Sequence, residues 1–177
     1  ELGLDKNQVL ERISVLNPAE GRFHTIRNSK NIIGIVDYMH TPDAYENVLS
    51  TINGIRTNTE KLIVVFGCGG DRDAEKRSKM TAIACNLSDQ VIITADNARK
   101  EKIEDIISDM TAKLDPVQKK KVLVITDRSQ AIKTACTLAS DGDIVLLAGK
   151  GHEKYQEIGG VKHYFDDVEE LVESLNI

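Results

Sequence analysis

Short apolar runs alternate with amphipathic stretches along most of the chain. The stretches between the runs place apolar residues three or four positions apart, which is the spacing of one helix face. Buried strands that alternate with helices are typical of a parallel sheet with right-handed crossovers. The pattern therefore predicts an α/β fold with a doubly wound, mostly parallel sheet. Its five predicted strands are residues 32–36, 62–66, 91–94, 122–125 and 144–147.

The helices are predicted by their caps and their apolar faces. In the first, Thr41 is the expected N-cap and Pro42 occupies the first helical position. Further helices are expected after the second, third and fourth strands. Near the C-terminus, Gly159 and Gly160 separate two β-like segments and predict a hairpin at the sheet's edge, before a closing helix. The expected inward positions are residues 44, 48, 52 and 55 of the first helix, 80, 83, 84 and 87 of the second, 103, 106, 107, 110 and 114 of the third, 131, 132, 135 and 138 of the fourth, and 168, 171, 172 and 175 of the last.

The first twenty residues have a different organisation. Residues 5–16 have the spacing of a helix, and Pro18 then interrupts the pattern. So short a segment cannot bury an apolar face by itself. We therefore expect residues 1–20 to be the last helix and linker of a preceding, mostly absent domain, and residues 21–177 to form a second domain.

Composition narrows the class of protein. The chain has 177 residues and a formal net charge of −5, with no long basic stripe, which argues against a nucleic-acid-binding protein. Its three cysteines form no C-x-x-C pair, so free thiols in a reducing cytoplasm are expected. No apolar run approaches the ~18–20 residues that a membrane-spanning helix needs.

A glycine-rich stretch, residues 66–77, joins the second strand to the next helix. Glycines at such a junction let backbone approach a ligand closely, and the helix N-terminus favours an anion. The stretch is neither a Walker A loop nor a G-x-G-x-x-G motif. Asp71 or Asp73 could instead serve only as a helix cap, so both a ligand site and a structural junction remain open.

Polar residues follow each predicted strand at its carboxyl end, where parallel sheets bind ligands. Guanidinium groups suit carboxylates or phosphates, and carboxylates suit an ammonium group. We therefore expect a zwitterionic or phosphorylated small ligand at one rim, although turns and helix caps would use many of the same residue types. Cys68 is interpreted as a packing residue. The rim residues are Asp37, Tyr38, His40, Asp71, Arg72, Asp73, Lys76, Arg77, Asp96, Asn97, Arg99, Asp127, Arg128, Gly149, Lys150, Gly151, His152 and Glu153.

Three short sequence motifs, taken together, indicate a family more specifically than any one of them does alone. They are Asp-Tyr-Met-His-Thr-Pro-Asp-Ala at residues 37–44, Gly-Cys-Gly-Gly-Asp-Arg-Asp at 67–73, and Ala-Gly-Lys-Gly-His-Glu-Lys-Tyr-Gln at 148–156. In this order and at these separations they resemble the Mur ligases, and among them the enzymes that add the third residue of the peptidoglycan stem. Residues 21–23 and 165–167 resemble the flanking motifs of the same family.

The resemblance implies a Rossmann-like C-terminal domain of a cytoplasmic, ATP-dependent amide-bond-forming ligase. Such enzymes use ATP and Mg²⁺ to activate UDP-MurNAc-L-Ala-D-Glu as an acyl phosphate, which the amine of a diamino acid attacks. The main ATP and Mg²⁺ sites belong to the absent central domain, so the fragment alone is expected to be inactive, without catalytic or metal-binding residues of its own. The resemblance assigns Arg22, Asp37, Tyr38 and His40 to the nucleotide, and Arg72, Asn97, Arg99, Gly149 and Glu153 to the incoming amino acid.

The chain departs from the family pattern where amino-acid choice is set. Ala98 replaces the proline of the Asp-Asn-Pro-Arg string, and Lys-Glu-Lys-Ile at residues 100–103 replaces an acidic, proline-containing segment. Loss of that proline is expected to loosen the turn, because its ring would fix φ. meso-Diaminopimelate is the expected amino acid, with a lysine-adding ligase as the alternative. A non-catalytic module that binds a nucleotide or an amino acid is a second alternative, since a fold does not determine a function.

Overall fold

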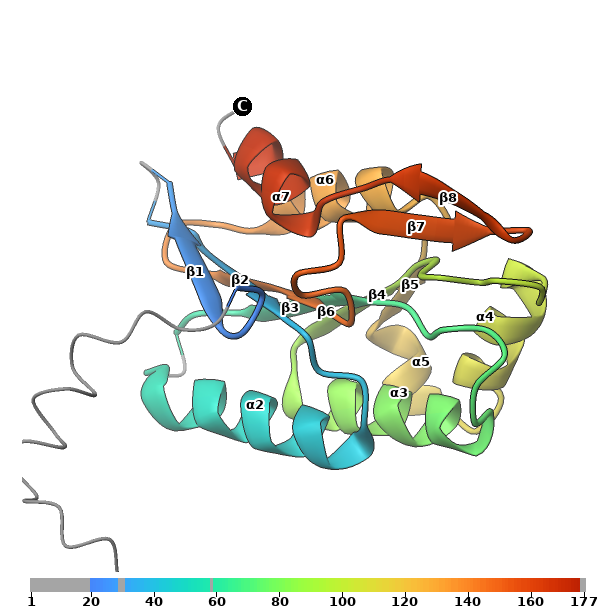
Figure 1. Cartoon of the computed structure of the whole chain (residues 1–177). Coiled ribbons are helices and arrows are strands. Elements are labelled where there is room, and N and C mark those ends of the chain that lie inside the picture. The colour runs from blue at the N-terminus through green and yellow to red at the C-terminus, as the bar shows by residue number, and fades with distance from the viewer. Residues whose placement is uncertain (1–19, 29–30, 58, 176–177) are drawn as a thin grey trace, which may run out of the picture.

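The computed structural model describes residues 20–28, 31–57 and 59–175 (Figure 1). The predicted helix at residues 5–16 lies outside these ranges, so the proposed division at residue 20 stays a prediction. The strands are β1 (His24–Arg27), β2 (Ile33–Asp37), β3 (Leu62–Phe66), β4 (Gln90–Ile93), β5 (Val122–Val124), β6 (Ile144–Ala148), β7 (Tyr155–Ile158) and β8 (Val161–Tyr164). The helices are α2 (Pro42–Ile55), α3 (Glu75–Leu87), α4 (Ile103–Thr111), α5 (Pro116–Lys120), α6 (Arg128–Leu138) and α7 (Asp167–Leu175).

Six strands form one sheet in the order β1-β2-β6-β3-β4-β5. All neighbours are parallel except β1, which pairs antiparallel with β2. The late strand β6 lies between β2 and β3, so the chain crosses over it on the way from β2 to β3. Helices α2 to α5 cover one face of the sheet, and α6 and α7 cover the other (Figure 1). The predicted doubly wound, mostly parallel α/β sheet is confirmed.

The core is divided by the sheet into two apolar layers. Alternate residues of β3 point to opposite faces: Val64 and Phe66 pack toward α2, α3 and α4, whereas Ile63 and Val65 pack toward α6 and α7. All four side chains are buried. Burial on both faces explains why the central strands read as continuous apolar runs instead of alternating patterns.

Three details differ from the sequence-based expectation. β1 is an additional strand that the pattern missed, because its residues His-Thr-Ile-Arg are mostly polar and only half-buried. The hairpin forms, but β7 and β8 make a separate two-stranded sheet, which meets the rest of the protein at a β-bridge between Arg99 and Ile158. In α2, Thr41 caps the helix as expected, but the buried stripe is Tyr45, Leu49 and Ile52, and Ile55 is 69% exposed. Periodicity alone does not decide on which residue such a stripe is centred.

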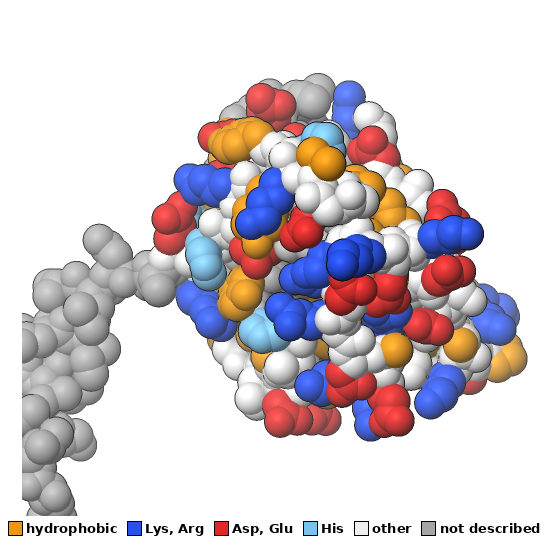
Figure 2. All heavy atoms as spheres, turned by 45° about the vertical axis from the view of Figure 1, so that its right-hand side comes forward, with side chains coloured by type: hydrophobic (Ala, Val, Ile, Leu, Met, Phe, Trp, Pro, Cys, Tyr) orange, Lys and Arg blue, Asp and Glu red, His pale blue; other side chains and the backbone are white. Residues whose placement is uncertain are grey.

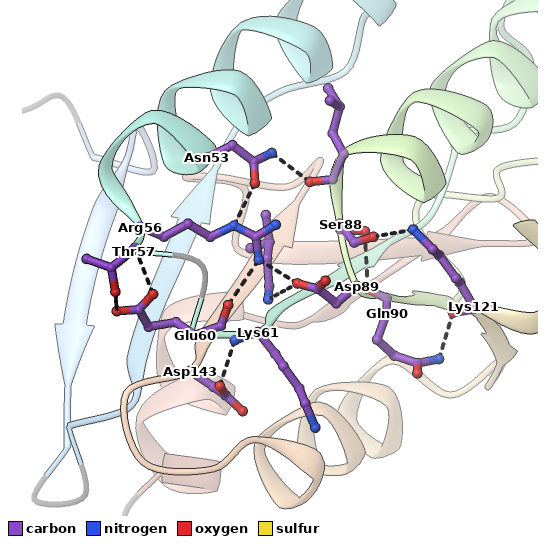
Figure 3. Close-up of polar contacts among 12 residues, drawn as sticks. Asn53, Arg56, Thr57, Glu60, Lys61, Ser88, Asp89, Gln90, Lys121 and Asp143 are labelled. Atoms are coloured by element: carbon purple, nitrogen blue, oxygen red, sulfur yellow. Dashed lines mark hydrogen bonds and ion pairs between the residues drawn. The ribbon is translucent and has the colours of Figure 1, made fainter.

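Polar contacts close the sheet at the end where β3, β4 and β6 begin (Figure 3). The buried Asp143 carboxylate accepts hydrogen bonds from the backbone N–H groups of Lys61 (2.7 Å) and Ser140 (2.8 Å). Nearby, Asp89 accepts one from the Leu62 N–H (2.8 Å) and pairs with Arg56. These residues lie at the amino ends of the strands, on the side of the sheet away from the carboxyl ends. Their role is to hold the strand ends and the adjoining loops in register.

Replacing Asp143 with alanine is expected to destabilise the fold without touching the opposite rim. The change leaves two backbone donors without their carboxylate, at about 1–3 kcal/mol for each group that stays unsatisfied. Equilibrium urea unfolding of the Asp143→Ala chain measures this loss. Asp141→Ala, two residues away at an exposed position, is the matched control and should stay within about 0.5 kcal/mol of wild type. Equal stability of the two variants would contradict the assigned role.

Candidate functional site

A pocket of about 460 Å³ opens beyond the carboxyl ends of β2, β3, β4 and β6. It lies at the strand-order switch, where open α/β sheets bind ligands. Figure 2 shows Lys, Arg, Asp and Glu side chains intermingled on the face turned forward in that view, with His among them. The pocket is lined by Tyr38, Met39, His40, Thr41, Tyr45, Gly67, Cys68, Gly69, Arg72, Asp73, Lys76, Arg77, Met80, Asp96, Asn97, Arg99, Gly149 and Glu153.

The glycine loop between β3 and α3 packs directly on the loop that follows β4. A Cβ atom at Gly67 would lie 2.4 Å from the Thr94 carbonyl oxygen, and one at Gly70 would lie 2.0 Å from the Ala98 carbonyl oxygen. The Gly70 N–H donates to the Asn97 carbonyl (2.9 Å). Close backbone approach between two loops therefore requires these glycines. Just before α3, Asp73 accepts a bond from the Glu75 N–H (3.0 Å). The N-cap position itself is Ala74, so neither Asp71 nor Asp73 is the helix cap.

The buried guanidinium of Arg77 holds the two loops together. It forms paired hydrogen bonds with Glu101 (both 2.8 Å), contacts Asp109 (2.9 Å) and donates to the Gly69 carbonyl (3.2 Å). Hydrogen bonding from Arg77 lowers the pKa of Glu101 from its ordinary value. Glu101 also accepts a bond from the Asp71 N–H. The segment that departs from the family pattern thus supplies the carboxylate that fastens the glycine loop.

The turn that lacks the family's proline is held by other contacts. Ala98 is buried, and Arg99 adopts the left-handed region with φ of 53°. The Arg99 N–H donates to the Glu157 carbonyl of β7 (3.1 Å), and its Nη1 donates to the Gly70 carbonyl (2.6 Å). These contacts restrain the backbone where a proline ring would have done so. That the turn is looser than one with proline stays a prediction.

The pocket brings together all five residues that the resemblance assigns to the amino acid. Asn97 is buried, and its Nδ2 donates to the Glu153 carboxylate (2.8 Å). At Gly149, φ is 113° and a Cβ atom would lie 3.1 Å from the Asp96 carboxylate, so glycine is required there. Within the described residues, neither Arg72 nor Arg99 pairs with a carboxylate. Two guanidinium groups therefore face the pocket with charge available for a ligand.

The four residues assigned to a nucleotide divide into two groups. Tyr38 and His40 line the same pocket, with their rings 4.8 Å apart. Arg22 lies over the Tyr38 ring, 5.1 Å from its centroid, and is not among the lining residues. Asp37 is buried beneath the surface, where its carboxylate accepts a bond from the Phe23 N–H (2.8 Å). Asp37 thus connects the segment just before β1 to the end of β2.

Besides Arg77, two more cations that the pattern places on the rim lie inside the protein. Arg128 is buried and pairs with Asp167, and the Lys150 ammonium group is fully buried near Asp96. Both follow strands, as expected, but their side chains turn inward. The sequence pattern shows that a residue follows a strand, but it does not show in which direction the side chain of that residue points. Arg77, also a predicted rim residue, does line the pocket, and Tyr45 is a further lining residue to which the sequence analysis gives no binding role.

Cys68 lines the pocket but is expected to be unreactive. Burial raises the pKa of its thiol from 9.0 to about 12. A raised thiol pKa means less thiolate, about a thousandfold less at pH 8, and the thiolate is the reactive form. Intact-mass measurement should show no alkylation by iodoacetamide at pH 8 while the protein stays folded, and three modified cysteines after unfolding. Rapid modification of Cys68 in the folded protein would contradict its burial.

The described residues contain no helix that is both long and apolar enough to cross a membrane. They also contain no group of three or more His, Cys, Asp or Glu side chains arranged to hold a metal ion.

Comparison with known proteins places this arrangement in a family. Residues 21–151 match the family model described as "Mur ligase, glutamate ligase domain". UDP-N-acetylmuramoyl-L-alanyl-D-glutamate–2,6-diaminopimelate ligase of Bacteroides thetaiotaomicron is 53% identical over 175 residues, covering 99% of this chain and 36% of that protein. The ligase of the same name from Clostridioides difficile is 49% identical over 175 residues, again covering 99% of this chain and 36% of that protein.

A solved structure gives the same answer. The structure titled as a UDP-N-acetylmuramoyl-L-alanyl-D-glutamate–2,6-diaminopimelate ligase superimposes with a TM-score of 0.81 at 44% identity, covering 98% of this chain and 35% of that one. The chain thus spans about a third of the length of the relatives it matches. With the family model matched over most of its length, the chain belongs to the Mur ligase family.

Proposed function

We propose that this chain is the amino-acid-binding domain of an ATP-dependent ligase that adds meso-diaminopimelate to UDP-MurNAc-L-Ala-D-Glu. The observation that carries the proposal is the charge arrangement of the pocket, where Arg72 and Arg99 supply unpaired guanidinium groups and Glu153 supplies a carboxylate. Diaminopimelate has two carboxylates and two ammonium groups, so it complements this set. The names of the relatives, which print 2,6-diaminopimelate, support the same substrate.

In this proposal the domain binds and orients the nucleophile. A positioned amine reacts far faster than a free one, because the loss of translational and rotational freedom has already occurred on binding. Arg99 holds the distal carboxylate of diaminopimelate, Glu153 holds its distal ammonium group, and Asn97 holds Glu153. The proximal amine is then left to attack the acyl phosphate. Lysine lacks the distal carboxylate and would leave Arg99 without a partner.

ATP and Mg²⁺ belong mainly to the part of the full-length protein outside this chain. Phosphoryl transfer needs a loop that holds the β- and γ-phosphates and ligands for Mg²⁺. Among the described residues, no group of three or more His, Cys, Asp or Glu side chains is arranged to hold a metal ion. Tyr38, His40 and Arg22 are proposed to contact the nucleotide, and Asp37 to support them from beneath.

The isolated chain is therefore expected to show no ATPase activity, whereas the full-length protein should form the tripeptide product from ATP, UDP-MurNAc-L-Ala-D-Glu and diaminopimelate. A coupled ADP-release assay on both proteins, with circular dichroism to confirm that the chain is folded, tests this. ATP turnover by the isolated chain would refute the assignment of the ATP site. Absence of product from the full-length protein would refute the ligase proposal.

A further inference from the structure

The buried ammonium group of Lys150 lies between the loop that follows β4 and the strand β7. It donates to the Tyr155 carbonyl (2.6 Å) and to Oδ1 of Asn97 (3.1 Å), and it pairs with Oδ1 of Asp96 (3.0 Å). Its side chain is 0% exposed, so it does not line the pocket surface. An ammonium group has three N–H donors: two of them donate to the Tyr155 and Asn97 oxygens, and Asp96 supplies a neighbouring negative charge without forming a hydrogen bond. The charge of Lys150 is thus directed entirely toward protein groups.

These contacts determine the direction of the Asn97 amide. Oδ1 of Asn97 accepts from Lys150 and also from the backbone N–H of Glu157 (2.9 Å). A flipped amide would place its NH₂ group against those two donors, which is unfavourable. The network therefore assigns the oxygen to the Lys150 side. Nδ2 is left to donate to Oε2 of Glu153, so the direction of the amide decides where the Glu153 carboxylate is held.

We propose that Lys150 is a positioning residue for amino-acid binding, which orients Asn97 and, through it, Glu153. This inference rests on the function proposed above. Lys150 touches no ligand itself and acts through the amide that it holds. The same contacts join the loop after β4 to β7, because Tyr155 and Glu157 both belong to that strand. Lys150 therefore also fixes the hairpin against the Asn97–Arg99 turn.

Lys150→Met in the full-length protein tests the proposal, because methionine keeps an unbranched apolar chain and removes the charge and the donors. The expected result is a KM for diaminopimelate raised by about 10–100-fold, taken from the loss found when the partner that orients a metal-binding side chain is removed. The KM values for ATP and for UDP-MurNAc-L-Ala-D-Glu should stay within about twofold. Lys154→Met is the matched control, since Lys154 lies in the same loop but is 53% exposed and pairs with Glu20 and Asp166. It should leave all three KM values unchanged.

An unchanged KM for diaminopimelate in Lys150→Met would overturn the proposal. A parallel rise in the KM values of all three substrates would overturn it as well, because that result indicates a structural role only. Failure of the proposed function is distinguishable, since the wild-type protein would then form no diaminopimelate product at all.

Lys150→Arg keeps the inference testable if the methionine variant does not fold. Arginine retains the charge, but its planar fork cannot match oxygens grouped around a single ammonium nitrogen. A selective rise in the KM for diaminopimelate is again expected, of at least about threefold, that is, smaller than the 10–100-fold range for lost orientation. Wild-type kinetics in this variant would overturn the proposal.

Discussion

Arg99→Ala in the full-length protein is expected to lower kcat/KM for diaminopimelate by roughly 30- to 5000-fold, which corresponds to the ~2–5 kcal/mol lost when one partner of a desolvated charge pair is removed. The reason is that the Arg99 guanidinium is half-buried, has no carboxylate partner among the described residues, and uses only Nη1, toward the Gly70 carbonyl. The rest of its donors are available for a carboxylate. Lysine has no distal carboxylate, so any residual activity with lysine should fall much less.

Two controls separate this charge effect from damage to the turn. Lys100→Ala changes the next, exposed residue and should leave kcat/KM for diaminopimelate within about twofold of wild type, as expected for a solvent-exposed side chain. Arg99→Lys keeps the charge but loses the bidentate geometry, so it should recover only part of the activity. If Arg99→Ala reduced the use of diaminopimelate and lysine equally, Arg99 would be a structural residue and not the selectivity determinant.

Arg128→Met is expected to destabilise the folded chain by about 3–5 kcal/mol, the usual cost of removing one member of a buried ion pair. Both side chains of the Arg128–Asp167 pair are 0% exposed, and two hydrogen bonds of 2.8 and 2.6 Å join them. Burial acts against the charged form, yet the Asp167 carboxylate raises the pKa of Arg128 above its ordinary value. Without Arg128, the Asp167 charge would be left buried and uncompensated.

Equilibrium unfolding of the chain in guanidinium chloride measures this loss of stability. A double variant provides the control. Arg128→Met combined with Asp167→Leu removes both charges, so most of the lost stability should return, because an apolar pair of similar volume often replaces a buried ion pair at little cost. Nη1 of Arg128 has no hydrogen-bond partner among the described residues, which favours this recovery. If the double variant were less stable than either single variant, the explanation by an uncompensated charge would be wrong.

The parts of the fold that follow from periodicity were predictable, and those that depend on tertiary packing were not. Central strands such as β3 and β6 carry continuous apolar runs because both faces are buried. β1 has no such signal, because it is a half-exposed edge strand. The hairpin was predictable from its two glycines, but its position was not, because the bridge between Arg99 and Ile158 is a contact between distant segments.

The site shows the same division between local and tertiary information. The rim of polar residues followed from the rule that ligands lie beyond the carboxyl ends of parallel strands, and the pocket there contains Arg72, Asn97 and Glu153. The directions of the Lys150 and Arg128 side chains were not predictable, because each turns toward acceptors supplied by other parts of the fold, such as the Tyr155 carbonyl of β7 and the Ala148 carbonyl of β6. The role of Glu101 was hidden for the same reason, since its partner Arg77 lies 24 positions away.

A crystal structure of the full-length protein with diaminopimelate bound tests the central claim most directly, because it shows which groups the amino acid contacts. Our account predicts that the amino acid occupies the pocket between the glycine loop and the Asn97–Arg99 turn. Its distal carboxylate should lie on Arg99, and its distal ammonium group within hydrogen-bond distance of Glu153. Binding of diaminopimelate elsewhere, with this pocket holding only the nucleotide, would contradict the account.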